Sequence, residues 1–205
     1  MSNFETPAIN NSFPSTRVLA DTLPGDRVRD VLLVFAGAGM TALGAQISIH
    51  VPQSPIPITG QTLAVVLAGA ALGTWRGAAS QMLYLVLGLF LPIYAGGTSG
   101  GSVLWGPAGG YIVGFVFAAA LTGWAAEHGA DRKPLLALLM FALGQLAIFG
   151  IGVPWLKVSA DLSWGTAIHE GFTIFLLGGV IKAVLAAIAM PTAWRVQRRV
   201  SRRVQ

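Results

Sequence analysis

Residues 134–153 read PLLALLMFALGQLAIFGIGV, twenty consecutive positions without a charged side chain. At 1.5 Å per residue, a helix of this length spans about 30 Å, which is the thickness of the hydrocarbon core of a membrane. Water-soluble domains carry charges on about a quarter of their residues, so an uncharged run of this length is unusual in them. The stretch therefore predicts a membrane-spanning helix.

Five further apolar segments flank this run. Of the 205 residues, 54% are hydrophobic and only 10% are charged, and the mean hydropathy is +0.69. These values predict an all-α membrane protein, a six-helix transmembrane bundle over residues 29–194. A cytoplasmic tail is expected at 1–28 and a basic cytoplasmic tail at 195–205. The predicted spans are 29–49, 61–75, 77–93, 109–126, 134–153 and 171–194.

The basic residues predict the orientation of the bundle. Eleven of the thirteen fall on one face of the six-span arrangement, and only Lys157 falls on the other. Loops rich in Lys and Arg stay in the cytoplasm, so both termini are expected there, in a bacterial cytoplasmic membrane. Tryptophans fall at both predicted interfaces: Trp75, Trp124 and Trp194 at the inner one, and Trp105, Trp155 and Trp164 at the outer one.

Several classes of function are disfavoured by the sequence. The net charge of +5 lies beside the predicted inner membrane surface, where lipid is the expected partner, and no basic groove interleaved with aromatics indicates nucleic acid. The chain has no cysteine, no paired carboxylates within a span and no His-Glu-x-x-His motif. We therefore expect a protein that is not an enzyme, with no catalytic residues, no metal site and no cofactor.

Two long outer connections are candidates for a binding site. Residues 50–60 contain three prolines, which stiffen the backbone and suit a lid, with Thr59 and Gln61 at the entry of the next helix. Thr59 alternatively serves only as a helix cap. Residues 94–111 are rich in glycine, which either lets the backbone approach a ligand or allows close helix packing. The ligand-binding candidates of this stretch are Gly96, Gly97, Gly106, Pro107, Gly109, Gly110 and Tyr111.

Lys182 is the only charged residue well inside a predicted span. It lies on the order of 16 Å from the start of the last span, where an unpaired charge is costly. Intramembrane ionisable groups usually face the bundle interior and mark a substrate or ion path, and an ammonium suits a ligand carboxylate. The alternative is a structural hydrogen bond or a side chain that snorkels to the interface.

The first span carries a face of small residues that includes Ala38 and Ala42. Such a face allows close helix contact, either with another helix of the bundle or with a separate membrane partner. The pattern alone leaves both alternatives open.

Several long motifs, in order, resemble the BioY family, the biotin-specific substrate-binding (S) components of energy-coupling factor (ECF) transporters. The segments that carry the resemblance are Gly44-Ala45-Gln46-Ile47-Ser48-Ile49, Pro55-Ile56-Pro57-Ile58-Thr59-Gly60-Gln61-Thr62, Leu83-Tyr84-Leu85-Val86-Leu87-Gly88 and Ala95-Gly96-Gly97 through Gly106-Pro107-Ala108-Gly109-Gly110-Tyr111.

The resemblance implies high-affinity capture of biotin from outside, with the biotin carboxylate directed to Lys182 and Tyr84 and Tyr111 as aromatic candidates for the pocket. It also implies partners: a transmembrane coupling protein (T component), contacted through Ala38 and Ala42, and two ATP-binding cassette ATPases. The family pattern in the last helix carries an aspartate where this chain has Gly179. Open alternatives are an S component for another vitamin, a stand-alone carrier and a ligand-free structural membrane protein.

Overall fold

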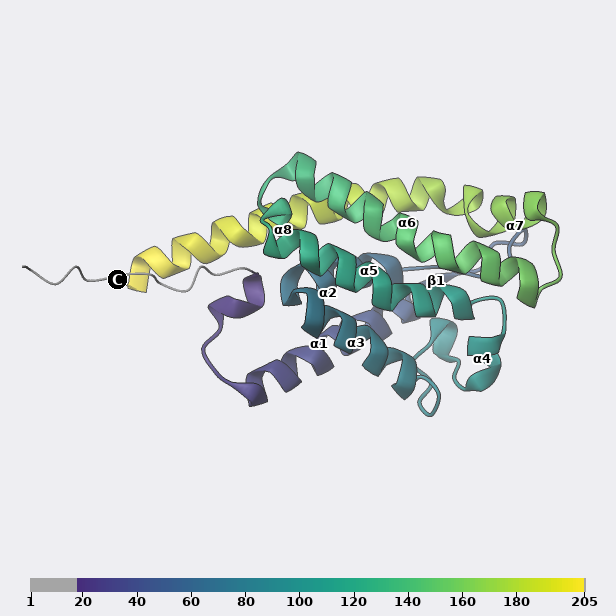
Figure 1. Cartoon of the computed structure of the whole chain (residues 1–205), viewed down its shortest axis with the longest axis horizontal. Helices are drawn as coiled ribbons and strands as arrows, with labels where there is room; N and C mark the ends of the chain where they lie inside the picture. The colour runs from purple at the N-terminus through teal and green to yellow at the C-terminus, as the bar shows by residue number, and fades with distance from the viewer. Residues whose placement is uncertain (1–17, 205) are drawn as a thin grey trace, which may run out of the picture.

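The computed structural model describes residues 18–204, which form a bundle of long helices (Figure 1). Residues 1–17, with Arg17 and most of the predicted N-terminal tail, lie outside the described residues, as does residue 205. The α-helices are α1 (Arg27–Gln46), α2 (Gln61–Leu72), α3 (Thr74–Leu87), α4 (Gly101–Trp105), α5 (Gly109–Glu127), α6 (Pro134–Ser159), α7 (Trp164–Gly171) and α8 (Leu176–Val204).

Short elements connect these helices. Strands β1 (Ser48–Ile49) and β2 (Ile58–Thr59) pair antiparallel, with Ser48 opposite Thr59. Single 3-10 turns are η1 (Leu19–Thr22), η2 (Ala95–Gly97), η3 (Ala130–Arg132) and η4 (Thr173–Phe175). Val18 and Ala20, which belong to the predicted tail, are buried against the bundle.

All six predicted spans are largely helical, but they differ in length. Among the described residues, four stretches are long and apolar enough to cross a membrane: Arg27–Gln46, Gly109–Glu127, Pro134–Ser159 and Trp164–Ser201. Helix α2 is apolar but has only 12 residues, about 18 Å of rise, and α3 has 14. The chain is thus a mostly helical protein with several apolar helices of membrane-spanning length.

The predicted boundaries fail mainly at the outer connections. Helix α6 continues through Pro154 to Ser159, because a proline removes only one backbone hydrogen bond and membrane helices tolerate it. The predicted connection 154–170 is therefore mostly helical, and only residues 160–163 separate α6 from α7. At the other end, α8 continues to Val204 and projects beyond the bundle in Figure 1.

Helices α2 and α3 meet at a single glycine. Gly73 has φ of 87°, a conformation that side-chain-bearing residues rarely adopt, and it ends α2 and begins α3. The carboxylate of Glu127 accepts hydrogen bonds from the Thr74 backbone N–H at 2.8 Å and from its hydroxyl at 3.0 Å. The hinge between the two short helices is thereby held against the end of α5.

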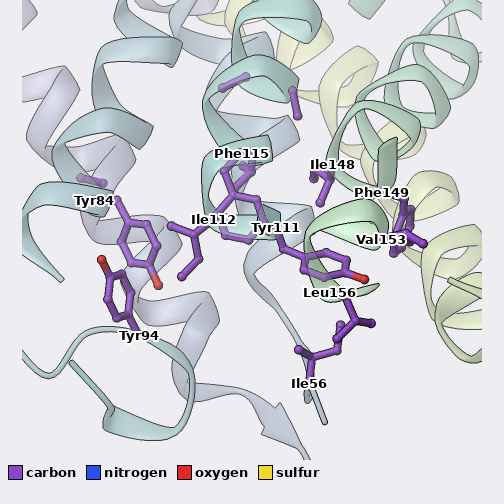
Figure 2. Packing of buried hydrophobic residues seen from close by; sticks show 14 of the residues in the cluster. Ile56, Tyr84, Tyr94, Tyr111, Ile112, Phe115, Ile148, Phe149, Val153 and Leu156 are labelled. Atoms are coloured by element: carbon purple, nitrogen blue, oxygen red, sulfur yellow. The ribbon is translucent and has the colours of Figure 1, made fainter. Parts of the chain in front are cut away.

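Helix α5 lies at the centre of the bundle, where it packs against α6, α2 and α3 (Figure 1). One hydrophobic cluster surrounds Tyr84, Tyr111 and Phe115, and a second surrounds Val66 and Phe141. Figure 2 shows the first cluster, in which the rings of Tyr84 and Tyr94 pack edge to face. Their ring centres are 5.6 Å apart. The outer surfaces of α1, α6 and α8 expose large apolar side chains such as Phe35, Leu143 and Ile188, as expected of faces that meet lipid.

Trp194 is buried, although its position predicts a side chain at the inner membrane interface. It is 5% exposed, and its indole N–H donates to the Asp131 carboxylate at 2.5 Å. The Arg132 guanidinium lies 4.5 Å from the centre of the indole ring. Burial raises the pKa of Asp131, so the ionised carboxylate depends on these neighbours for its stability. The contact fastens α8 to the connection between α5 and α6.

Two glycines at the start of α5 permit close packing. A Cβ at Gly110 would clash with the Trp155 side chain of α6, and one at Gly109 would clash with the Leu104 backbone. Trp155 also donates its indole N–H to the Gly106 carbonyl at 3.1 Å. Its ring stacks on that of Trp105, with the ring centres 5.9 Å apart. The end of the glycine-rich segment, at Gly106 and Gly110, is therefore packed tightly against α6.

Trp194→Phe is expected to lower the free energy of unfolding by about 1–3 kcal/mol, because it leaves a buried carboxylate without its indole donor. Thermal unfolding of the purified protein in detergent measures the loss. Trp124→Phe is the matched control, since Trp124 is 54% exposed. Equal losses in both variants would contradict a special role for the Asp131 contact.

Gly110→Ala is expected to cost about 1–3 kcal/mol of stability, because the added methyl group overpacks the contact with Trp155. Gly101→Ala should be neutral, since its Cβ would meet its nearest neighbour at 3.9 Å. The same thermal assay compares the two variants. If Gly110→Ala keeps full stability and instead weakens ligand binding, the segment approaches a ligand rather than packing.

Candidate functional site

A cavity lies at the end of the bundle that carries the two long connections 50–60 and 94–108. Its volume is about 60 Å³, several times the 10–15 Å³ that one water molecule needs. Its lining is mainly apolar, with a few polar groups, as is common for small-molecule sites. The lining residues are Ile56, Pro57, Thr59, Gln61, Thr62, Tyr94, Ala95, Val103, Ala108, Tyr111, Ile112, Phe115, Gln145, Phe149, Phe175, Gly179 and Lys182.

Lys182 reaches this cavity from α8. Its ammonium donates to the Thr59 backbone carbonyl at 2.6 Å and to the Thr62 hydroxyl at 3.0 Å. Both acceptors are neutral, and the cavity lining, as far as the described residues form it, contains no carboxylate. An ammonium has three N–H groups, so one is available beyond these two contacts. The site thus presents a positive charge in apolar surroundings, which favours an anionic ligand.

Thr59 and Gln61 belong to a chain of hydrogen bonds at the start of α2. The Thr59 hydroxyl donates to the Gln61 side-chain carbonyl at 2.8 Å, and the Gln61 amide donates to the Tyr84 hydroxyl at 2.6 Å. Tyr84 in turn donates to the Ile93 carbonyl at 3.2 Å. Tyr84 is fully buried and does not line the cavity, so its role is to hold the Gln61 side chain in position through this hydrogen bond.

Tyr111 lines the cavity from α5 and is fixed by its hydroxyl, which donates to the Gly171 carbonyl at 2.9 Å. Figure 2 shows its ring among Ile112, Phe149 and Leu156. Besides Tyr111, the glycine-rich segment contributes the side chains of Tyr94, Ala95, Val103 and Ala108. None of the predicted residues Gly96, Gly97, Gly106, Pro107, Gly109 and Gly110 lines the cavity.

The proline-containing segment forms part of the cavity wall. Ile56 is 5% exposed and lines the cavity beside Pro57. The Ser54 hydroxyl donates to the Glu170 carbonyl of α7 at 2.8 Å and accepts from the Ile56 N–H at 3.2 Å. Ser54 therefore latches this segment, which we call the lid (residues 50–57), to α7.

Gln145 is a cavity residue that the sequence prediction missed. It lies on α6 and is 7% exposed, and neither its side-chain oxygen nor its nitrogen has a hydrogen-bond partner among the described residues. The available signal is its position, because Gln145 is the only side chain with strong hydrogen-bonding groups in the run 135–153. A polar side chain in such a run marks a place where the interior is not purely apolar.

Ala38 and Ala42 lie away from the cavity on α1. Ala38 is 3% exposed and belongs to the core cluster around Tyr84, and Ala42 packs against the same cluster. The structure thus places Ala38 in internal packing, which is one of the two alternatives left by the sequence. Contact of this pair with a partner stays a prediction.

Comparisons with known proteins agree with these features. Residues 14–199 match the BioY family. The biotin transporter BioY of Rhizobium etli is 34% identical over 168 residues, which cover 77% of this chain and 88% of that one. The biotin transporter BioY of Thermotoga maritima is 35% identical over 159 residues, covering 76% and 91%.

A solved structure shares the fold. The crystal structure of the S-component for biotin from an ECF-type ABC transporter superposes with a TM-score of 0.74 at 24% identity, covering 84% of this chain and 95% of that one. The match over residues 14–199, together with relatives that are more than 30% identical over most of both chains, shows that this chain belongs to the BioY family.

Proposed function

We propose that this protein captures biotin at the outer face of the bacterial cytoplasmic membrane, as the S component of an ECF importer. Its relatives are named biotin transporters, and the solved structure of the same fold is named for biotin. The observation that carries the proposal within this chain is Lys182, a half-buried ammonium with only neutral partners in a mainly apolar cavity.

Biotin has the chemistry that such a cavity requires. Its valerate carboxylate is an anion, and the ammonium of Lys182 neutralises it in the low-dielectric interior. Its hydrocarbon chain and thioether ring suit walls such as Phe115, Phe149 and Tyr111. Thr59 and Gln61 add polar atoms at the same end, and Tyr84 holds Gln61 in place. The transported biotin is the only small molecule that the proposal requires, with no cofactor.

In the proposed membrane arrangement, α2 and α3 complete a set of six spans and both termini lie in the cytoplasm. The clustered arginines at the end of α8 support this orientation, since basic segments remain on the cytoplasmic side. The importer then needs a T component and two ATP-binding cassette ATPases, because this chain lacks the Gly-Lys-Ser/Thr phosphate-binding motif. Of the pair expected to contact the T component, Ala38 is buried within the bundle, so the proposed contact on α1 rests on Ala42, which is only partly buried.

Lys182→Met is expected to weaken biotin binding by roughly 10- to 100-fold, because it removes the charge-assisted hydrogen bond to the carboxylate while retaining a side chain of similar length. Titration of the purified full chain with biotin measures the change.

Lys157→Met is the control for this variant. Lys157 lies near the outer end of α6, with its ammonium 5.6 Å from the Trp164 ring, and it does not line the cavity. Unchanged biotin affinity in Lys182→Met would remove Lys182 from the site. Binding of a different vitamin, or of none, by the wild-type chain would instead reject biotin as the ligand.

Ser54→Ala is expected to accelerate biotin dissociation several-fold, because the latch between the lid and α7 contributes about one net hydrogen bond. Stopped-flow chase with unlabelled biotin measures the rate. Ser99→Ala, at an exposed position in the other outer connection, is the matched control. Identical dissociation rates in the two variants would show that the lid does not gate release.

A further inference from the structure

Gln145 differs from the other buried glutamines of the bundle. Gln81 is fully buried, and its amide donates to the Ser80 hydroxyl at 3.0 Å while its carbonyl accepts from Thr41 at 3.0 Å. Gln61 is likewise paired through both ends of its amide. Gln145 is 93% buried yet has no partner among the described residues, and it lines the cavity. Buried amides are normally paired, so this one requires a partner from within the cavity.

Three residues of α8 that share a gap with Gln145 offer no hydrogen-bonding side chain, and the polar side chain of α8 in the cavity is Lys182. Gln145 and the α8 residues Gly179, Val180 and Ala183 line one apolar gap, which also adjoins the cavity at Gln145, Phe149 and Gly179. None of these three α8 residues has a polar side chain. A Cβ at Gly179 would meet no heavy atom within 4 Å, so the space beside the amide is open.

A primary carboxamide presents a carbonyl acceptor and an N–H donor side by side. The group that complements both at once is one in which N–H and C=O are also adjacent and cis, such as a cyclic urea or a lactam. Aromatic and aliphatic walls, including Phe115 and Phe149, leave such a group few other partners. In the proposed function, Lys182 binds a different chemical feature of the ligand, its carboxylate.

We infer that Gln145 is a specificity-determining residue that binds the cyclic urea of the ligand through two paired hydrogen bonds, while Lys182 binds its carboxylate. This inference rests on the proposed function, in which the ligand is biotin. It assigns the two ends of one molecule to two residues on different helices, α6 and α8. It also predicts that the two residues can be separated by ligands altered at one end only.

The test uses the purified full chain with three probes: biotin, biotinamide, which lacks the anionic carboxylate, and 2-iminobiotin, whose urea oxygen is replaced by an imine. In Gln145→Leu, affinity for biotin and for biotinamide should fall by the same factor, roughly 10- to 100-fold, because two hydrogen bonds are lost from either ligand. The preference for biotin over biotinamide should stay at its wild-type ratio. In Lys182→Met, that ratio should collapse toward one.

Stability separates recognition from structure. Gln145→Leu replaces an unpaired buried amide by an apolar side chain, so its thermal midpoint without ligand should equal or exceed that of the wild type. A lower midpoint together with unchanged biotin affinity would show a structural role and overturn the inference.

Gln145→Glu tests the pairing directly. A carboxylate accepts two hydrogen bonds from the guanidinium of 2-iminobiotin but cannot donate to the urea oxygen of biotin. The ratio of affinities should therefore shift toward 2-iminobiotin by about tenfold or more. No shift would overturn the inference.

The wild-type titration separates the two proposals. Tight binding of biotin by the wild type, with unaltered affinity in both Gln145 variants, leaves the proposed function standing and rejects the role of Gln145. Absence of biotin binding by the wild type rejects both.

Discussion

An ammonium within a membrane-spanning helix needs hydrogen-bond acceptors from the protein, because hydrocarbon offers none. Lys182 obtains two of them from the start of α2, the Thr59 carbonyl and the Thr62 hydroxyl. These contacts tie α8 to the strand that leads into α2, and hence to the lid. The position of the ammonium thus depends on the strand and helix start that follow the lid, and the arrangement keeps a positive charge that neutral oxygens alone do not cancel.

The fold was largely predictable because lipid imposes a simple rule. Only helices satisfy their own backbone hydrogen bonds in hydrocarbon, so uncharged runs such as 134–153 indicate helices directly. The rule is silent about where a helix ends outside the hydrocarbon. The predicted span ends before Pro154, whereas α6 continues for six more residues, to Ser159, and Trp155 packs on the start of α5. Trp194 shows the same limit. Its position near the predicted interface does not reveal that its ring is buried and that its indole N–H pairs with Asp131.

Site residues of a rare type in this sequence were predictable, whereas residues of a common type, such as glycine, were not. Lys182 stands out as a lone charge, and the structure places it in the cavity with Thr59, Gln61 and Tyr111. The glycines from 96 to 110 do not line it, because a high glycine content indicates close backbone approach without saying to what, and here Gly110 approaches Trp155. Gln145 was missed because a single neutral amide barely alters the apolar character of its helix, although neither end of that amide is paired.

The Thr59 acceptor is a main-chain atom, and this has a consequence for how the region tolerates genetic change. Replacing the residue at position 59 exchanges its hydroxyl but leaves the peptide oxygen in place, provided that the β1 and β2 pairing survives. Alanine scanning through this stretch would therefore under-report its importance to Lys182. Substitutions at position 59 can therefore accumulate without removing the hydrogen bond between Lys182 and the main-chain oxygen. A shift of the strand by one residue would instead move that oxygen away.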